Sequence, residues 1–263
     1  MVSIFRKIRR ALLEQNKVTR YLAYAVGEIA LVMIGILLAL QVNNWNENRK
    51  DRIKEQKVLL ELKTLFEENI AQLEDKILIR KNIIQKAGEV ISYIDNNEEV
   101  QLDTLTQKLS AIILAPTYDP IDNGLMDSEN LQLLSNDSLR RMLSKFPSGI
   151  ADLKQQEDEF VKLYFNSITP FLIQNGLARD VHQSFYGDAA NLTYMLDNSV
   201  VNQINLGKSK KKTNVMGILN DVEFESILAT TLSVNVGVNW ESESYRKQML
   251  EILNFITSEI DPD

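Results

Sequence analysis

The sequence predicts an all-α protein in which one N-terminal transmembrane helix continues into a long helix, followed by a helical bundle. Three features carry this prediction: a single long apolar run over 21–42, apolar residues at helical spacing over 59–94, and a near absence of strand-like alternation. The chain has 263 residues, of which 44% are hydrophobic and 25% charged. This composition is ordinary for a folded protein.

The apolar run Tyr21–Val42 contains Glu28 as its only charged residue. A helix rises about 1.5 Å per residue, so about 20 residues cross the roughly 30 Å hydrocarbon layer of a bilayer. No other stretch of the sequence has this length and character, and we expect one transmembrane helix over 21–45. Trp45 marks its far interface, where aromatic residues are enriched.

Residues 1–20 form a basic segment whose apolar residues fall on one side of a helix, which suits the headgroup layer of a bilayer. A cleaved signal peptide is the alternative. The apolar run is longer than the core of a usual signal peptide, however, and no A-x-A-like cleavage site follows it. We therefore expect a signal anchor that stays in the protein.

Charge indicates the orientation and the class of partner. Six Lys and Arg residues precede the span, and Arg20 adjoins it, whereas the first positive charge after it is Arg49. Because positive residues favour the cytoplasmic side, we expect a cytoplasmic N-terminus and a C-terminal domain outside the cytoplasm. Residues 1–57 carry eleven Lys/Arg against five Asp/Glu, and the remainder eighteen against thirty-one. The basic part favours the lipid bilayer as a partner, while the acidic part excludes nucleic acid.

The segment 46–98 is expected to be a long helix leaving the membrane. Its apolar seam advances in steps of three and four residues, with one missing position at Arg80. Such a seam fits either a parallel dimeric coiled coil or the first helix of an intramolecular bundle. Val58, Leu65 and Ile83 widen the stripe beyond a two-stranded seam, which favours the bundle. The seam consists of Leu59, Leu62, Phe66, Ile70, Leu73, Ile77, Ile84, Ala87, Ile91 and Ile94.

Residues 99–263 are expected to form a helical C-terminal domain that packs on the long helix. Asp95–Asn97 ends the long helix, and Asn136 or Asp137 is a candidate N-cap. Pro147–Gly149 is expected to separate two helices. A long helix is expected to begin over Ile150–Phe165 and to continue past Pro170, with a kink, to Gly176. The remaining helices are expected near Leu102–Leu114, Val181–Phe185, Leu192–Leu196, Val215–Val236 and Glu241–Ile260.

Residues 5–17 read FRKIRRALLEQNK and residues 21–47 read YLAYAVGEIALVMIGILLALQVNNWNE. A basic N-terminus that leads into a YA-x-GE-[IV] span ending in Q-x-NNWNE resembles a bacterial family of single-pass membrane proteins of unknown function. The likeness continues in Leu59–Glu74 and Pro116–Pro147, and it weakens after Phe165. The resemblance implies a bacterial inner-membrane protein with a periplasmic helical domain. It implies no activity.

Glu28 is the candidate polar site within the membrane. A carboxylate at the centre of a bilayer costs about 2.5–3.5 kcal/mol on insertion scales. Seven residues after Tyr21, Glu28 would lie only about 10 Å deep, so it can reach back to the headgroups or become protonated. A structural role, a polar contact to another membrane helix and proton-coupled work all remain open.

Small residues run along the same span at spacings of four, except for Leu31 in the middle, and such residues let two helices approach closely in lipid. They predict a homo-oligomer or packing against another membrane protein. The positions are Ala23, Gly27, Gly35 and Ala39.

We expect no enzyme, no cofactor and no metal site. The chain has no cysteine, His182 is its only histidine, and no phosphate-binding loop or nucleophile motif occurs. The function expected is a non-enzymatic interaction, scaffold or sensory module; the alternative is an accessory subunit of a larger membrane complex, with Glu28 buried against partner helices. The candidate partner-facing loop contains Tyr118, Asp119, Asp122 and Asn123.

Overall fold

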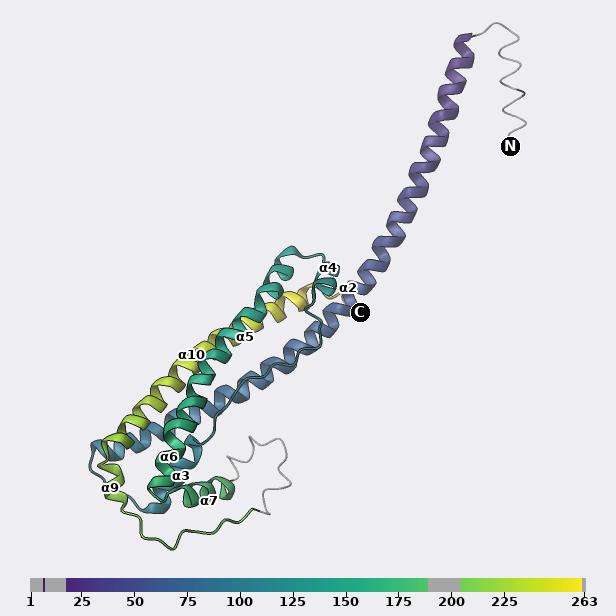
Figure 1. Ribbon diagram of the computed structural model, residues 1–263. Coiled ribbons are helices and arrows are strands. Elements are labelled where there is room, and N and C mark those ends of the chain that lie inside the picture. Colours follow the sequence, from purple (N-terminus) through teal and green to yellow (C-terminus); the bar gives the residue numbers. More distant parts are fainter. Residues whose placement is uncertain (1–6, 8–17, 189–203, 262–263) are drawn as a thin grey trace. The chain divides into compact units, whose positions relative to one another are not determined.

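The computed structural model describes residues 7, 18–188 and 204–261, and every regular element in this part of the chain is a helix (Figure 1). The predicted all-α class is confirmed. The chain divides into two compact units, Met1–Lys57 and Val58–Asp263. The boundary between the units therefore falls inside the segment 46–98, and the rest of that segment belongs to the same unit as the later helices.

The helix α2 (Val18–Asp95) is continuous over 78 residues. It contains no proline, so no position in its interior lacks a backbone donor. It ends where Asn97 adopts a left-handed conformation, with φ of 50°, and the Glu98 N–H donates to the Tyr93 carbonyl at 3.0 Å. A left-handed residue of this kind closes a helix C-terminus. The prediction that the helix continues past Asn46 and ends at Asp95–Asn97 is confirmed.

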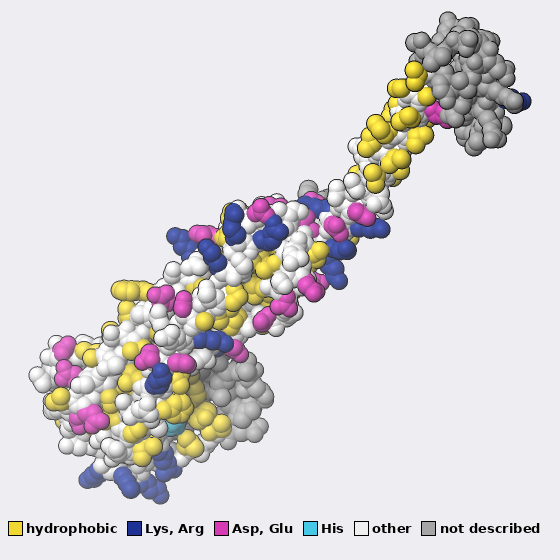
Figure 2. Space-filling view, turned by 45° about the horizontal axis from the view of Figure 1, so that its top comes forward, with side chains coloured by type: hydrophobic (Ala, Val, Ile, Leu, Met, Phe, Trp, Pro, Cys, Tyr) yellow, Lys and Arg dark blue, Asp and Glu magenta, His cyan; other side chains and the backbone are white. Residues whose placement is uncertain are grey.

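In the first unit, α2 has an apolar surface that the described residues leave uncovered. It is the one helix, among the described residues, that is long and apolar enough to cross a membrane, and none of its most apolar window is buried within the protein. Leu31 is 71% exposed and Leu38 is 58% exposed. Figure 2 shows this stretch as a run of hydrophobic side chains. A core helix of a soluble protein would bury this surface, which costs roughly 25 cal/mol per Å² when left in water.

The second unit packs the rest of α2 against two long helical segments, one of which is broken by a π-helical turn, and several short helices. The helices α5 and α10 lie side by side along their length (Figure 1). Charged side chains of both signs lie across the face of this unit seen in Figure 2, with apolar side chains between them. The elements are α3 (Leu102–Ile112), α4 (Ser128–Leu133), α5 (Asp137–Leu163), η1 (Tyr164–Ile168), α6 (Thr169–Gln174), α7 (Ala178–Gly187), α9 (Val215–Leu219) and α10 (Val222–Glu259).

Local chemistry explains several of these boundaries. The Asn136 side chain accepts from the N–H groups of Ser138 and Leu139, which confirms it as the N-cap of α5. The π-helical turn η1 precedes Pro170, and the Thr169 N–H donates to the Tyr164 carbonyl. This wider turn lets the helical path pass a residue that has no N–H to donate.

Two sequence predictions for the second unit are wrong. The segment Pro147–Gly149 does not separate helices, because α5 continues through it. The helices predicted near Val215–Val236 and Glu241–Ile260 are instead the short α9 and the single helix α10, whose buried positions keep a spacing of three and four residues throughout. The helix predicted at Leu192–Leu196 lies outside the described residues.

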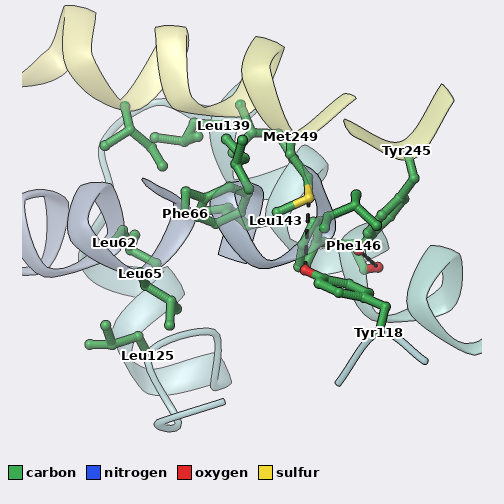
Figure 3. Packing of buried hydrophobic residues seen from close by; sticks show 14 of the residues in the cluster. Leu62, Leu65, Phe66, Tyr118, Leu125, Leu139, Leu143, Phe146, Tyr245 and Met249 are labelled. Atoms are coloured by element: carbon green, nitrogen blue, oxygen red, sulfur yellow. Dashed lines mark hydrogen bonds between the residues drawn. The ribbon is translucent and has the colours of Figure 1, made fainter. Parts of the chain in front are cut away.

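The second unit has two hydrophobic clusters. The first cluster packs Val58–Ile77 of α2 against the first half of α5 and the second half of α10. Figure 3 shows its aromatic centre, where Phe66, Phe146, Tyr118 and Tyr245 lie together. The second cluster packs the later part of α2, from Ile79 to Val90, against the other end of α10, the end of α5, the turn η1, and the helices α3, α6, α7 and α9.

Candidate functional site

A buried ion pair between Arg80 and Glu157 joins α2 to α5. Both residues are almost completely buried, with 1% and 2% of their surfaces exposed. The Arg80 guanidinium donates to the Glu157 carboxylate, to the Ser242 hydroxyl at 2.6 Å and to the Pro116 carbonyl at 3.3 Å. The second Glu157 oxygen accepts the Tyr118 N–H at 2.8 Å. The pair therefore connects α2, α5, α10 and the loop before α4 at one point.

The pair lies where the two hydrophobic clusters meet. On α2, the first cluster ends at Ile77 and the second begins at Ile79; on α5, Glu157 lies between Leu153 and Phe160. Burial raises the pKa of the Glu157 carboxyl, and the neighbouring Arg80 charge partly opposes this effect. Such a pair is stable only when hydrogen bonds satisfy both groups, as they do here.

A cleft of about 440 Å³ opens between α5 and α10. Its walls include the buried side chains of Phe146, Leu153, Tyr245 and Ile252. The Tyr245 ring stacks on Phe146 with centroids 5.1 Å apart, and its hydroxyl donates to the Phe146 carbonyl at 3.1 Å. The exposed lining residues are Lys145, Ser148, Asp152, Glu241, Ser244, Gln248 and Glu251.

Gly149 allows the Tyr245 ring to lie directly against α5. A Cβ atom at this position would be 2.6 Å from Cε2 of Tyr245, which is closer than two carbon atoms can approach. Glycine costs about 0.5–1 kcal/mol relative to alanine inside a helix, and an interior proline such as Pro147 costs about 3 kcal/mol or more. Two residues that disfavour a helix therefore occur close together inside α5, which forms nevertheless.

Tyr118 links the ion pair to the cleft. Its N–H binds Glu157, its ring meets Tyr245 edge-on with centroids 6.3 Å apart, and its hydroxyl donates to the Met249 sulfur at 3.8 Å (Figure 3). Burial raises the pKa of the Tyr118 hydroxyl. Tyr118 is 0% exposed, so its place in the partner-facing loop is corrected: the ring belongs to the core, where its apolar area is removed from water.

The other loop residues named from the sequence are at the surface. Asp119 pairs with Lys154 at 2.8 Å, and this charge lowers the pKa of the Asp119 carboxyl. The Asn69 side chain holds Ile121 through both its backbone groups, at 2.8 and 3.1 Å. Asp122 and Asn123 accept backbone N–H groups two residues further on, from Gly124 and Leu125. The loop is thus fixed, and its partner-facing role stays a prediction.

The residues predicted within the membrane span lie on α2 of the first unit. Glu28 is half-buried and lines a shallow depression with Ala25, Ile29, Val32, Met33 and Ile36. Gly27 and Gly35 have open space at the Cβ position, and Ala39 is exposed. The side chain of Ala23 is outside the described part. A role in helix packing within a membrane stays a prediction for all four small residues.

Sequence reasoning missed Arg80, Glu157 and the cleft. The sequence does mark Arg80, because it is the one position where the apolar seam of the long helix is interrupted. A charged residue at a position where the helical spacing predicts a buried one is the signal for a buried ion pair. No group of three or more His, Cys, Asp or Glu that could hold a metal ion occurs among the described residues. Burial lowers the pKa of the half-buried His182.

The model of a family of unknown function, DUF6090, matches residues 28–118, about a third of the chain. The match agrees with the predicted likeness to a family of unknown function. It includes Arg80 and ends at Tyr118, whereas Glu157 and the cleft lie outside it. No curated protein and no solved structure matches the chain.

Proposed function

We propose that this protein is a single-pass membrane-anchored module that works by binding a ligand or partner and catalyses no reaction. The observation that carries the proposal is α2, which contains an uncovered apolar stretch of membrane-spanning length and also supplies the first helix of the second unit. A stretch of this kind is stable in lipid and unfavourable in water. It serves as the anchor.

The N-terminus is in the cytoplasm and the second unit is on the other side of the membrane. Six Lys and Arg residues before the span, with Arg20 directly beside it, support this orientation. The net negative charge of residues 58–263 keeps them from binding anionic headgroups. In a bacterium this arrangement corresponds to the inner membrane, with the helical unit in the periplasm.

The loop before α4 supports the binding role. Asp119 has 85% of its side chain exposed, yet the loop that carries it is held by Asn69, Lys154 and Glu157. A surface ordered before it binds loses less conformational entropy on association than a flexible one. Asp119, Asp122 and Asn123 therefore present a fixed polar surface to a partner.

Thiol labelling in intact cells tests the anchor and its orientation, because the chain has no cysteine of its own. One variant carries Ser3→Cys before the span, and a matched variant carries Ser209→Cys in the second unit. We expect a membrane-impermeant maleimide to label position 209 in cells with a permeable outer membrane, and position 3 only after the inner membrane is opened. The opposite pattern would overturn the orientation, and recovery of the protein in the soluble fraction would overturn the anchor.

A further inference from the structure

We propose that the cleft between α5 and α10 binds an organic cation, a small molecule with an ammonium group and an apolar body. This inference deepens the ligand-binding part of the proposed function and rests on it for its biological role. Binding itself depends only on the cleft and can be measured whichever side of the membrane the cleft faces.

The dimensions and floor of the cleft suit a small molecule. Its volume of about 440 Å³ lies within the range of roughly 300–1,000 Å³ for ligand pockets. The floor is aromatic and aliphatic, and the Tyr245 ring is held in place by Phe146 on one side and Tyr118 at its edge. An apolar body placed here would displace water from a preformed surface.

The charge of the residues that line the cleft determines the sign of the charge on the ligand. Three carboxylates, those of Asp152, Glu241 and Glu251, face one cation, Lys145. Among the described residues, none of these three carboxylates forms an ion pair or a hydrogen bond. Other acids nearby are paired: Glu243 with Lys81 at 2.7 Å, and Glu74 with Arg246 at 2.5 Å. Three carboxylates without an ion pair thus lie together at the cleft, where they attract a cation.

The same lining favours an organic cation over a metal ion. Within the described part of the chain, Asp152, Glu241 and Glu251 do not form a group that could hold a metal. Carboxylates at the rim of an apolar floor instead suit a small molecule whose ammonium group is attached to an apolar part.

The local sequence also sets this part of α5 apart. Pro147 and Gly149 disfavour a helix, yet both occur inside α5, and Gly149 lines the cleft. Gly149 leaves the space that the Tyr245 ring fills. Departures from local sequence preference concentrate at functional sites. Here the departure shapes the floor of the cleft.

A single thiol at the rim tests the proposal on the full-length protein in lipid nanodiscs. Ser244→Cys places the thiol at the cleft, and Ser226→Cys places a control thiol on the exposed face of the same helix, outside the cleft. The rates of modification by thiosulfonates carrying a trimethylammonium or a sulfonate group are compared at each position. We expect the preference for the cationic reagent to be about fivefold larger at position 244, because the carboxylates attract it.

Protection by a ligand then reports binding. The probe is 2-phenylethylamine, which is an ammonium ion at neutral pH, and the control is 3-phenylpropionate, an anion of similar size. We expect the amine to slow modification at position 244, with no effect at position 226, and the carboxylate to give no protection. Equal protection by both compounds, or no protection by the amine at about 10 mM, would overturn the proposal.

Matched charge variants complete the test. Asp152→Asn with Glu241→Gln removes one cleft acid from each helix, and Asp158→Asn with Glu225→Gln removes one exposed acid from each helix away from it. The cleft variant should need about tenfold more amine for half protection, and the control variant less than about twofold more. Equal effects would assign the attraction to overall charge and overturn the site. If the cleft variant fails to fold, the two reagents on the Ser244→Cys protein still decide. A failed cleft test leaves the orientation labelling at positions 3 and 209 unaffected.

Discussion

The two hydrophobic clusters of the second unit use different chemistry to fill their cores. The first cluster contains Tyr118 and Tyr245, whose hydroxyls bind a methionine sulfur and a backbone carbonyl, and it adjoins the cleft of about 440 Å³. The second cluster stacks Phe171 on Phe224 with centroids 5.2 Å apart and encloses a void of only about 10 Å³. A void of that size is at most enough for one water molecule.

This difference indicates how the unit divides its tasks. The second cluster is closed and apolar, as expected of a part whose only task is stability. The first cluster contains polar groups in fixed positions beside an open cleft, as expected of a part that recognises something. The Arg80–Glu157 pair lies between the clusters and contacts both the loop at Tyr118 and α10. The pair thus joins α2, α5 and α10 at the point where the two clusters meet.

Breaking the buried ion pair should have one of the two largest effects. Glu157→Leu leaves the Arg80 charge buried without its partner, and we expect a loss of about 3–5 kcal/mol in the free energy of unfolding. Urea unfolding of the full-length protein in detergent, followed by circular dichroism of the helices, measures it.

The double variant Arg80→Met with Glu157→Leu is the control, because it removes both charges and replaces them with apolar groups of similar volume. It should recover most of the stability lost in the single variant. If the double variant is as unstable as the single one, the charge of Arg80 is not the cause of the loss.

A substitution in the second cluster should change stability through packing alone. Phe224→Ala removes a fully buried ring that stacks on Phe171, and we expect a loss of about 3–5 kcal/mol from the cavity and the lost burial. Urea unfolding measures the loss. Under conditions where this variant is folded, modification of a thiol at position 244 should proceed at its usual rate. A changed rate would mean that the two clusters are not independent.

The sequence predicts most of the helical fold because helices leave a local signal. The seam of α2 and the cap at Asn136 are set by neighbours three and four residues away, so they are readable without tertiary knowledge. Pro147 and Gly149 give the opposite local signal, and tertiary packing overrides it: the α5 helix continues because Phe146 and Leu153, on either side, are both buried in the first cluster.

The candidate site is less predictable, because its parts are far apart in the sequence. Arg80 and Glu157 are 77 residues apart, and Ser242 is 162 residues from Arg80. No spacing rule connects such positions, and only the interrupted seam at Arg80 marks one end of the network. Tyr118 shows the same limit: two prolines and several acids around it predict an exposed loop, yet its ring is buried through contacts with α10.

A smaller change tests the shape of the first cluster. Gly149→Ala places a Cβ 2.6 Å from the Tyr245 ring, which cannot yield without losing its stack on Phe146. We expect a net loss of about 1–2 kcal/mol in the free energy of unfolding, since overpacking outweighs the gain in helix propensity.

Gly88→Ala is the matched control within α2. Its new Cβ would meet Leu232 at an ordinary 3.8 Å, so it should stabilise the protein by about 0.5–1 kcal/mol. Urea unfolding compares the two, and equal stabilisation would mean that the close approach is not tight.

The smallest expected effect is the pH dependence of stability that comes from Glu89, on the part of α2 that packs in the second cluster. Burial alone would raise the pKa of Glu89, but hydrogen bonds from Lys108 at 2.5 Å, Lys86 and Gln85 lower it to about 2. In the unfolded chain the same carboxyl has its ordinary pKa of 4.5. The ionised Glu89 carboxylate with its lysine partners therefore contributes its full stability above about pH 4.5. This contribution is lost as the pH falls toward 2, because the unfolded chain takes up the proton first.

Glu89→Gln should cost about 0.5–1 kcal/mol in the free energy of unfolding at pH 7, as for other partly exposed pairs, and nearly nothing at pH 2.5. Urea unfolding at both pH values measures the difference, and a cost that is the same at pH 7 and pH 2.5 would show that the contacts of Glu89 stabilise α2 and α3 through packing rather than through its charge.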